Sequence, residues 1–182
     1  MFRFLYKIPI IFVSWRQKKV RVKTHQIVSY LEIPLAISEV FDFFSKADNL
    51  ESITPPELRF EIVSPKPIEI RQGSIIEYDL RLYGIKFRWR ALISEWLPGK
   101  RFVDEQVSGP YKLWRHSHEV EQIEGGSFIH DRVTYALPLN PLGEIVFPIV
   151  RLQLRRIFSY RQQQVIKLLA QDPDMCKWSV SC

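Results

Sequence analysis

The chain has 182 residues, a length typical of a single domain that buries its own core without disulfides. Hydrophobic residues make up 46%, aromatic residues 13% and charged residues 25% of the chain, which are the proportions of a globular protein. The two cysteines, Cys176 and Cys182, both lie at the C-terminal end. They exclude a disulfide scaffold, and we expect a reducing, cytoplasmic compartment.

The net charge of +6 comes from one end of the chain. Residues 1–23 hold seven of the 26 basic residues and no acidic residue, which leaves 19 basic residues against all 20 acidic ones. Because the remainder is close to neutral, nucleic-acid binding loses its main support, and we predict no nucleic-acid partner.

We interpret residues 1–23 as a basic, aromatic N-terminal extension. Its apolar run, 8–13, is too short for a spanning helix, which needs roughly 20 residues. Aromatic residues alternate with bases in "MFRFLYKIPIIFVSWRQKK" (1–19), a pattern that favours peripheral contact with a membrane surface. Two alternatives remain open: an unstructured extension, or upstream codons that are not translated.

Hydrophobic periodicity then predicts the elements in chain order. A strand is expected at 24–33, followed by two short helices within 37–53, broken near 46–49, and by the helix-stopping "TPPE" at 54–57. Alternation with short turns predicts antiparallel strands near 58–64, 74–83, 85–96, 101–108, 112–122 and 127–137. Helical spacing returns at 143–171, with a late start or a kink at Pro148, and 171–182 is expected to be a loose tail.

This order predicts an α+β fold, with a seven-stranded curved antiparallel sheet wrapped around one long C-terminal helix. A single helix cannot fill a broad curved sheet, so we expect a cavity between them. The predicted domain spans 24–170 and is expected to be a monomer.

Four segments carry a family resemblance: "NLESITPPELRFEI", "YDLRLYGIKFRWRALISEW", "FVDEQVSGPYKLWRHSHEVEQI" and "HDRVTYALP". Over about 24–170 they resemble the START-like helix-grip (SRPBCC) superfamily, in particular its bacterial ligand-binding, polyketide cyclase/dehydrase-like branch. The resemblance implies the helix-grip fold. It does not determine an activity, because the superfamily includes lipid carriers, hormone receptors, pollen allergens and a few aromatase/cyclases.

Alternation along the strands places one set of side chains toward the predicted cavity. Polar residues occur in this inward set, and Tyr111 is expected at the cavity mouth. The predicted ligand-binding residues are Phe87, Trp89, Phe102, Asp104, Gln106, Tyr111, Trp114, His116 and His118.

Inward polar groups need partners, and three interpretations are open. Asp104, Gln106, His116 and His118 either satisfy one another, or orient the polar end of an apolar ligand, or hold a metal ion through His116, His118 and Asp104. Since no cysteine pair or glutamate–histidine motif accompanies them, we predict neither a metal nor a cofactor. The facing of His130 and Asp131 is ambiguous.

We therefore expect a carrier or sensor of a small hydrophobic molecule of the lipid, polyketide or quinone class. The alternative is a cyclase/dehydratase-type enzyme with His116 or His118 as general acid/base and Asp104 as orienter. A weaker alternative is a protein-interaction module without ligand. No nucleophile–base–orienter set is evident, so no catalytic residue is assigned.

Overall fold

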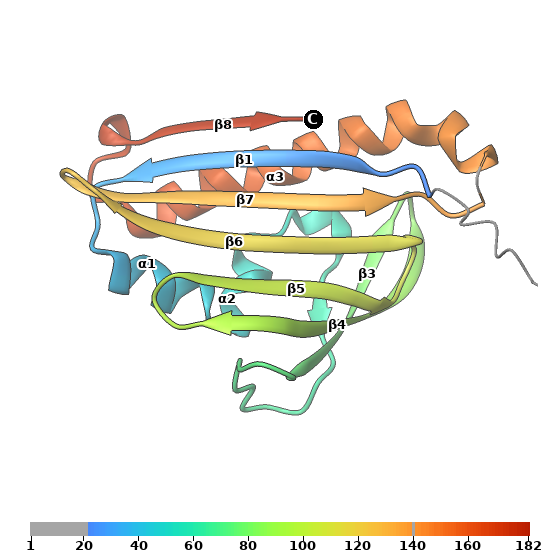
Figure 1. Ribbon diagram of the computed structural model, residues 1–182, viewed down its shortest axis with the longest axis horizontal. Helices are drawn as coiled ribbons and strands as arrows, with labels where there is room; N and C mark the ends of the chain where they lie inside the picture. The colour runs from blue at the N-terminus through green and yellow to red at the C-terminus, as the bar shows by residue number, and fades with distance from the viewer. Residues whose placement is uncertain (1–21, 140) are drawn as a thin grey trace, which may run out of the picture.

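The computed structural model describes residues 22–139 and 141–182, and the predicted membrane segment 1–19 lies outside them. Its strands and helices follow the predicted order (Figure 1). The strands are β1 (His25–Ile33), β2 (Glu61–Ile62), β3 (Ile75–Leu82), β4 (Ile85–Leu97), β5 (Arg101–Ser108), β6 (Leu113–Ile123), β7 (Gly126–Ala136) and β8 (Lys177–Ser181). The helices are α1 (Ile37–Phe44), α2 (Ala47–Ser52) and α3 (Phe147–Leu169), with 3₁₀ turns η1 (Pro56–Leu58), η2 (Leu142–Val146) and η3 (Pro173–Met175).

All strands join one curved antiparallel sheet in the order β2-β3-β4-β5-β6-β7-β1-β8. The long helix α3 lies across one face of the sheet, and α1 and α2 cover another part of the same face (Figure 1). The predicted fold class, a curved antiparallel sheet gripping a C-terminal helix, is confirmed.

The prediction of a loose tail at 171–182 is wrong. Residues Lys177–Ser181 form β8, which pairs antiparallel with β1 and adds an eighth strand to the sheet. Without β8 the backbone groups of β1 would lie at an open sheet edge. A five-residue strand has too few alternating positions to be recognised by periodicity. Its partner β1 is also remote in sequence, so no hairpin turn marks it.

One boundary differs from the predictions and another agrees with them, and prolines explain both. The strand predicted at 58–64 is reduced to β2, because Pro55 and Pro56 start the 3₁₀ turn η1, after which Arg59 takes a left-handed φ of 44°. The C-terminal helix starts late, as Pro148 indicated. Pro148 lies in the first turn of α3, where its missing N–H has no intrahelical partner to lose.

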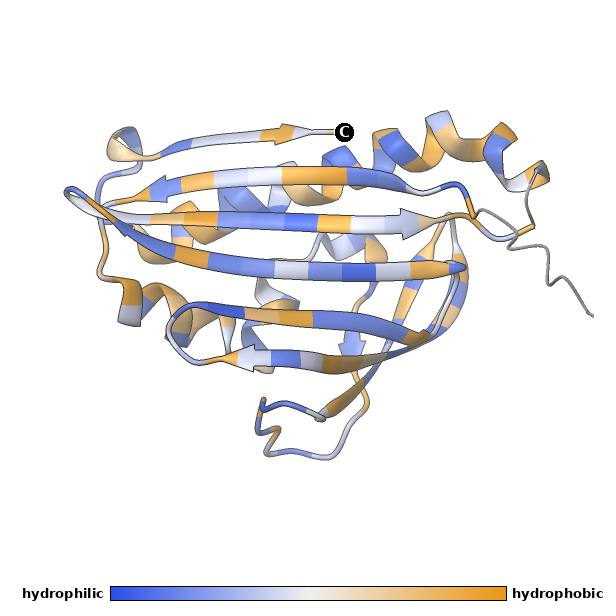
Figure 2. Ribbon diagram, in the orientation of Figure 1, coloured by the Kyte–Doolittle hydropathy of each residue, from blue (hydrophilic) through white to orange (hydrophobic). Residues whose placement is uncertain are grey.

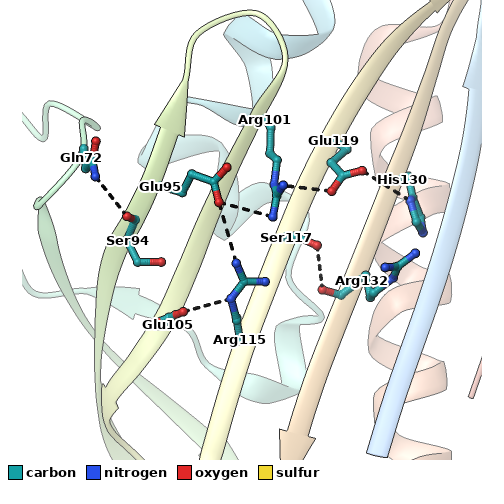
Figure 3. A network of polar contacts seen from close by, with 10 residues as sticks. All are labelled: Gln72, Ser94, Glu95, Arg101, Glu105, Arg115, Ser117, Glu119, His130 and Arg132. Carbon is teal, nitrogen blue, oxygen red and sulfur yellow. Dashed lines mark hydrogen bonds and ion pairs between the residues drawn. The ribbon is translucent and has the colours of Figure 1, made fainter.

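The two faces of the sheet differ in polarity, as the alternation in Figure 2 illustrates. On the outer face arginines and glutamates pair across β4, β5 and β6: Arg115 lies 3.1 Å from Glu105 and 3.8 Å from Glu95 (Figure 3). The inner face packs against α3 through Leu154, Phe158 and Val165. This division leaves the inner face free to line a cavity.

One buried polar contact fixes α3 on the sheet. The amide Nε2 of Gln162 donates a hydrogen bond of 2.9 Å to the hydroxyl of Ser29 on β1, and both side chains are buried. A buried polar pair of this kind favours one position of the helix over others, because a shifted helix would leave both groups unsatisfied.

Candidate functional site

A cavity of about 170 Å³ lies between the sheet and the helices. Its walls come from β3, β4, β5 and β6 on one side and from α1, α2 and α3 on the other. Most of the lining is apolar. Its polar members are Lys46, Asn49, Thr54, Asp104, His116, His118 and Arg161, apart from the ring N–H and O–H groups of tryptophan and tyrosine.

Aromatic rings form one wall of the cavity. The ring centroid of Trp89 on β4 lies 5.3 Å from that of Trp114 and 5.8 Å from that of Tyr111. Trp89 is buried, and its Nε1–H has no hydrogen-bond partner among the residues that the structure describes. A buried donor without a partner is destabilising by roughly 1–3 kcal/mol, so a ligand acceptor here would remove a penalty.

At the sheet side of the cavity, Asp104, His116, His118 and Asp131 form a polar cluster, which we call the carboxylate–imidazole cluster. Asp104 Oδ2 lies 3.3 Å from His118 Nε2 and 3.4 Å from His116 Nδ1. Asp131 Oδ1 lies 2.7 Å from His118 Nδ1 and 3.6 Å from His116 Nε2. Each ring therefore has one nitrogen near Asp104 and the other near Asp131, so both rings lie between the two carboxylates. The imidazole centroids are 3.8 Å apart.

The cluster separates the pKa values of its two histidines. Burial, followed by the neighbouring His118, lowers the pKa of His116 to about 4, so His116 is neutral at neutral pH. Burial alone would lower the pKa of His118 as well, but Asp131 and Asp104 raise it above its ordinary value. Burial would raise the pKa of both carboxyl groups, but the imidazoles hold the pKa of Asp104 below its usual range and that of Asp131 well below it.

Helical spacing predicts a solvated face for the arginines of the C-terminal helix, but Arg161 on α3 lines the cavity. Its guanidinium lies 5.5 Å from the ring centroid of Phe44, and its charge helps to lower the pKa of Asp104 and Asp131. The helical spacing placed Arg161 beside the apolar stripe. Only the docking of α3 on the sheet brings Arg161 close to the carboxylates of Asp104 and Asp131.

The structure brings together most of the predicted site residues but not all of them. Six of the nine line the cavity: Trp89, Asp104, Tyr111, Trp114, His116 and His118. The other three, Phe87, Phe102 and Gln106, are not part of the lining. Phe102 stacks on His118 at 4.1 Å, and Phe87 packs in the core near Trp89. Gln106 donates to the carbonyl of Tyr111 at 2.7 Å and so supports the link between β5 and β6.

Asp131 and His130, whose facing was ambiguous, lie on opposite faces of β7. Asp131 is fully buried in the cluster. His130 lies on the outer face, 3.9 Å from Glu119 (Figure 3), and stacks on Tyr30. The apolar neighbours at 129, 133 and 135 share the parity of Asp131, and this signal could have placed it inward.

The cluster has the groups for two kinds of chemistry. One ligand atom each from Asp104, His116 and His118 lies within 4.8 Å of the others, so these three side chains could hold a metal ion. The imidazoles can also exchange protons with a molecule in the cavity, which they line directly.

No model of a known protein family matches this sequence, and no curated protein matches it. Solved structures do. The Zhui aromatase/cyclase from Streptomyces sp. R1128 is 10% identical, with a TM-score of 0.65 over 80% of this chain and 93% of that chain. A START superfamily protein from Mycobacterium smegmatis is 11% identical, with a TM-score of 0.60 over 79% of this chain and 99% of that chain.

A nucleoside-diphosphate sugar epimerase from Corynebacterium glutamicum is 26% identical, with a TM-score of 0.54 over 77% of this chain. The match takes up 28% of that much longer chain. Together these likenesses show that the chain has the helix-grip fold. They confirm at the level of the fold what the sequence resemblance implied.

Proposed function

We propose that this protein binds a small hydrophobic molecule with one polar end in its cavity, as a carrier or sensor. The observation that carries the proposal is an apolar cavity with polar groups in its wall: the Nε1–H of Trp89, which has no hydrogen-bond partner within 22–139 and 141–182, and the side chains of Asp104, His116 and His118. Convergent polar groups in an otherwise apolar lining are typical of ligand sites. The START superfamily protein and the aromatase/cyclase share the fold that forms this cavity.

The cavity volume limits the size of this ligand. An engineered apolar cavity of about 150 Å³ holds benzene, whereas sites for drug-sized ligands enclose about 300–1,000 Å³. At about 170 Å³ the cavity accepts a molecule of one or two rings as it stands. A whole lipid, polyketide or quinone would require α1, α2 or α3 to move away from the sheet.

Filling the cavity is expected to weaken ligand binding. Ala91 on β4 is buried and lines the cavity, so Ala91→Leu places extra carbon atoms in the ligand space. We expect the affinity for 2-naphthol, measured by calorimetry, to fall about tenfold or more, equivalent to about 1.4 kcal/mol. The control Ser108→Leu adds the same side chain at an exposed site of β5 and should bind as the unsubstituted protein does.

Native mass spectrometry of the freshly purified protein tests the same point with its own ligand. A co-purified compound that survives Ala91→Leu at full stoichiometry would contradict binding in the cavity. Conversion of a bound compound to a product would instead favour the cyclase/dehydratase alternative.

We also propose that the protein contacts a membrane surface at the periphery. Five aliphatic side chains around η2 and the start of α3 are 55–79% exposed, and together we call them the η2–α3 patch: Leu139, Leu142, Ile145, Ile149 and Leu152. Figure 2 shows hydrophobic residues along the start of α3, at the end of the molecule where β1 begins. Lys23, the last residue of the basic extension, lies 2.8 Å from Glu144 within η2. No helix in the described part of the chain is long and apolar enough to cross a membrane.

Vesicle binding tests this contact. The full chain should sediment with phosphatidylglycerol-containing vesicles at low salt, and a chain that begins at Lys23 should not. Changing Ile145, Ile149 and Leu152 to serine should weaken binding about tenfold or more, because one buried aliphatic side chain contributes roughly 1.5–3 kcal/mol. Serine at Ile85 and Val107, which are exposed elsewhere on the sheet, is the control. Equal sedimentation of all these proteins would remove the proposal.

A further inference from the structure

We propose that Asp104, His116 and His118 bind a divalent metal ion of the zinc type at the polar wall of the cavity, with Asp131 orienting both imidazoles from behind. The sequence offered a metal only as the last of three interpretations and left the facing of Asp131 ambiguous. The structure adds Asp131 and the distances.

The contacts of Asp104 are longer than charge-assisted hydrogen bonds usually are. Charge-assisted N–H···O bonds to carboxylates are about 2.7–2.9 Å long. Asp104 Oδ2 instead lies 3.3 Å from His118 Nε2 and 3.4 Å from His116 Nδ1. Ligand atoms about 2.0–2.1 Å from a tetrahedral zinc ion lie about 3.3–3.4 Å apart. Both separations from Asp104 therefore match ligands that share one ion, and the ligand atoms of all three residues lie within 4.8 Å of one another.

Asp131 occupies the position of an outer carboxylate. Each imidazole turns one nitrogen toward Asp104 and the other toward Asp131, at 2.7 Å for His118 and 3.6 Å for His116. Metal-ligating histidines almost always have such a partner at the second nitrogen. Asp131 is fully buried, and neither of its oxygens accepts an aligned hydrogen bond within 22–139 and 141–182. Because Asp131 is removed from water, a cation on the far side of the imidazoles would further stabilise its charge.

The fourth position of a tetrahedral ion would face the cavity, since all three proposed ligands line it. An open fourth position is the mark of a zinc site that binds a ligand or a water molecule. Two carboxylates balance a divalent cation, and Arg161 then adds one positive charge at the same cavity. This charge pattern favours a ligand with an anionic oxygen, such as a phenolate, an enolate or a carboxylate. That extension to ligand class rests on the proposed function, whereas the metal site does not.

The test uses the metal alone, with the full untagged chain carrying Cys176→Ser and Cys182→Ser, because both free thiols would bind zinc adventitiously. After treatment with a chelator and its removal, one equivalent of Co²⁺ should give the visible absorption of a four-coordinate ion, and Zn²⁺ should displace it. Asp104→Asn and His118→Gln should abolish this absorption. Asp131→Asn should weaken Zn²⁺ binding about 10–100-fold, as loss of an outer partner does.

His130→Gln is the matched control, because this histidine lies on the outer face of the neighbouring strand. It should bind Co²⁺ as the parent protein does. Absence of the four-coordinate signal in the parent protein, or its persistence in Asp104→Asn, would overturn the metal site. Should His118→Gln fail to fold, as judged by circular dichroism, the near-isosteric Asp104→Asn still decides. A parent protein that binds 2-naphthol but no metal ion would overturn this inference alone. A parent protein that binds the metal ion but not 2-naphthol would overturn the proposed function alone.

Discussion

Replacing Phe158 by alanine is expected to lower the free energy of unfolding by about 3–5 kcal/mol, the usual effect of removing a buried aromatic ring. Phe158 lies on α3 with 3% of its surface exposed, and it belongs to the same core cluster as Leu154 and Tyr135. It also lines the cavity, and its ring centroid lies 5.5 Å from that of His116. The truncation would enlarge a space that is already empty of protein atoms, so little of the loss can be recovered by collapse.

Chemical denaturation monitored by tryptophan fluorescence measures this effect. Leu152→Ala, on the same helix but 66% exposed, is the matched control and should change the free energy by no more than about 0.5 kcal/mol. In a domain of this size the loss at Phe158 corresponds to roughly 2–4 °C in melting temperature per kcal/mol. If both substitutions had the same small effect, α3 would not be gripped by the sheet as described.

The second large effect is expected at Gly126, the first residue of β7. A Cβ atom there would lie 2.2 Å from the carbonyl oxygen of Ile33 and 2.8 Å from Cα of Pro34, which are both backbone atoms. Since backbone cannot move aside as a side chain does, Gly126→Ala should be destabilising by about 3 kcal/mol or more, at the upper end of overpacking effects.

The neighbouring Gly125 provides a control with a different physical origin. It has a φ of 80° and open space around its Cα, so Gly125→Ala meets only backbone strain of about 1–2 kcal/mol. Thermal melts of the two single variants should therefore differ, with Gly126→Ala the lower. A reversed order would show that the end of β1 does not pack against the start of β7 in the way the distances indicate.

This pair of glycines shows what sequence alone can and cannot predict. The short turn predicted between the strands at 112–122 and 127–137 falls at "EGG" (124–126), because glycine favours the left-handed conformation that Gly125 adopts. The requirement at Gly126 arises from Ile33 and Pro34, which are more than 90 residues away along the chain, and no local pattern contains it.

The candidate site likewise has a part that the sequence predicts and a part that it does not. Side chains alternate along a strand, so the inward facing of Asp104, His116 and His118 was determined by the sequence of β5 and β6 themselves. The antiparallel pairing of those strands then places Asp104 opposite His116. These are local and nearest-neighbour relations, and composition and turn signals were sufficient to predict them.

Contacts between remote segments were decided only by the tertiary structure. The docking of α3 brings Arg161 to the cavity, and pairing of β7 with β6 places Asp131 behind the two imidazoles. Pairing of β8 with β1 converts a predicted loose tail into the last strand of the sheet. Each depends on packing free energy summed over many side chains, whereas periodicity in the sequence reports only which face of an element is buried, not which partner buries it.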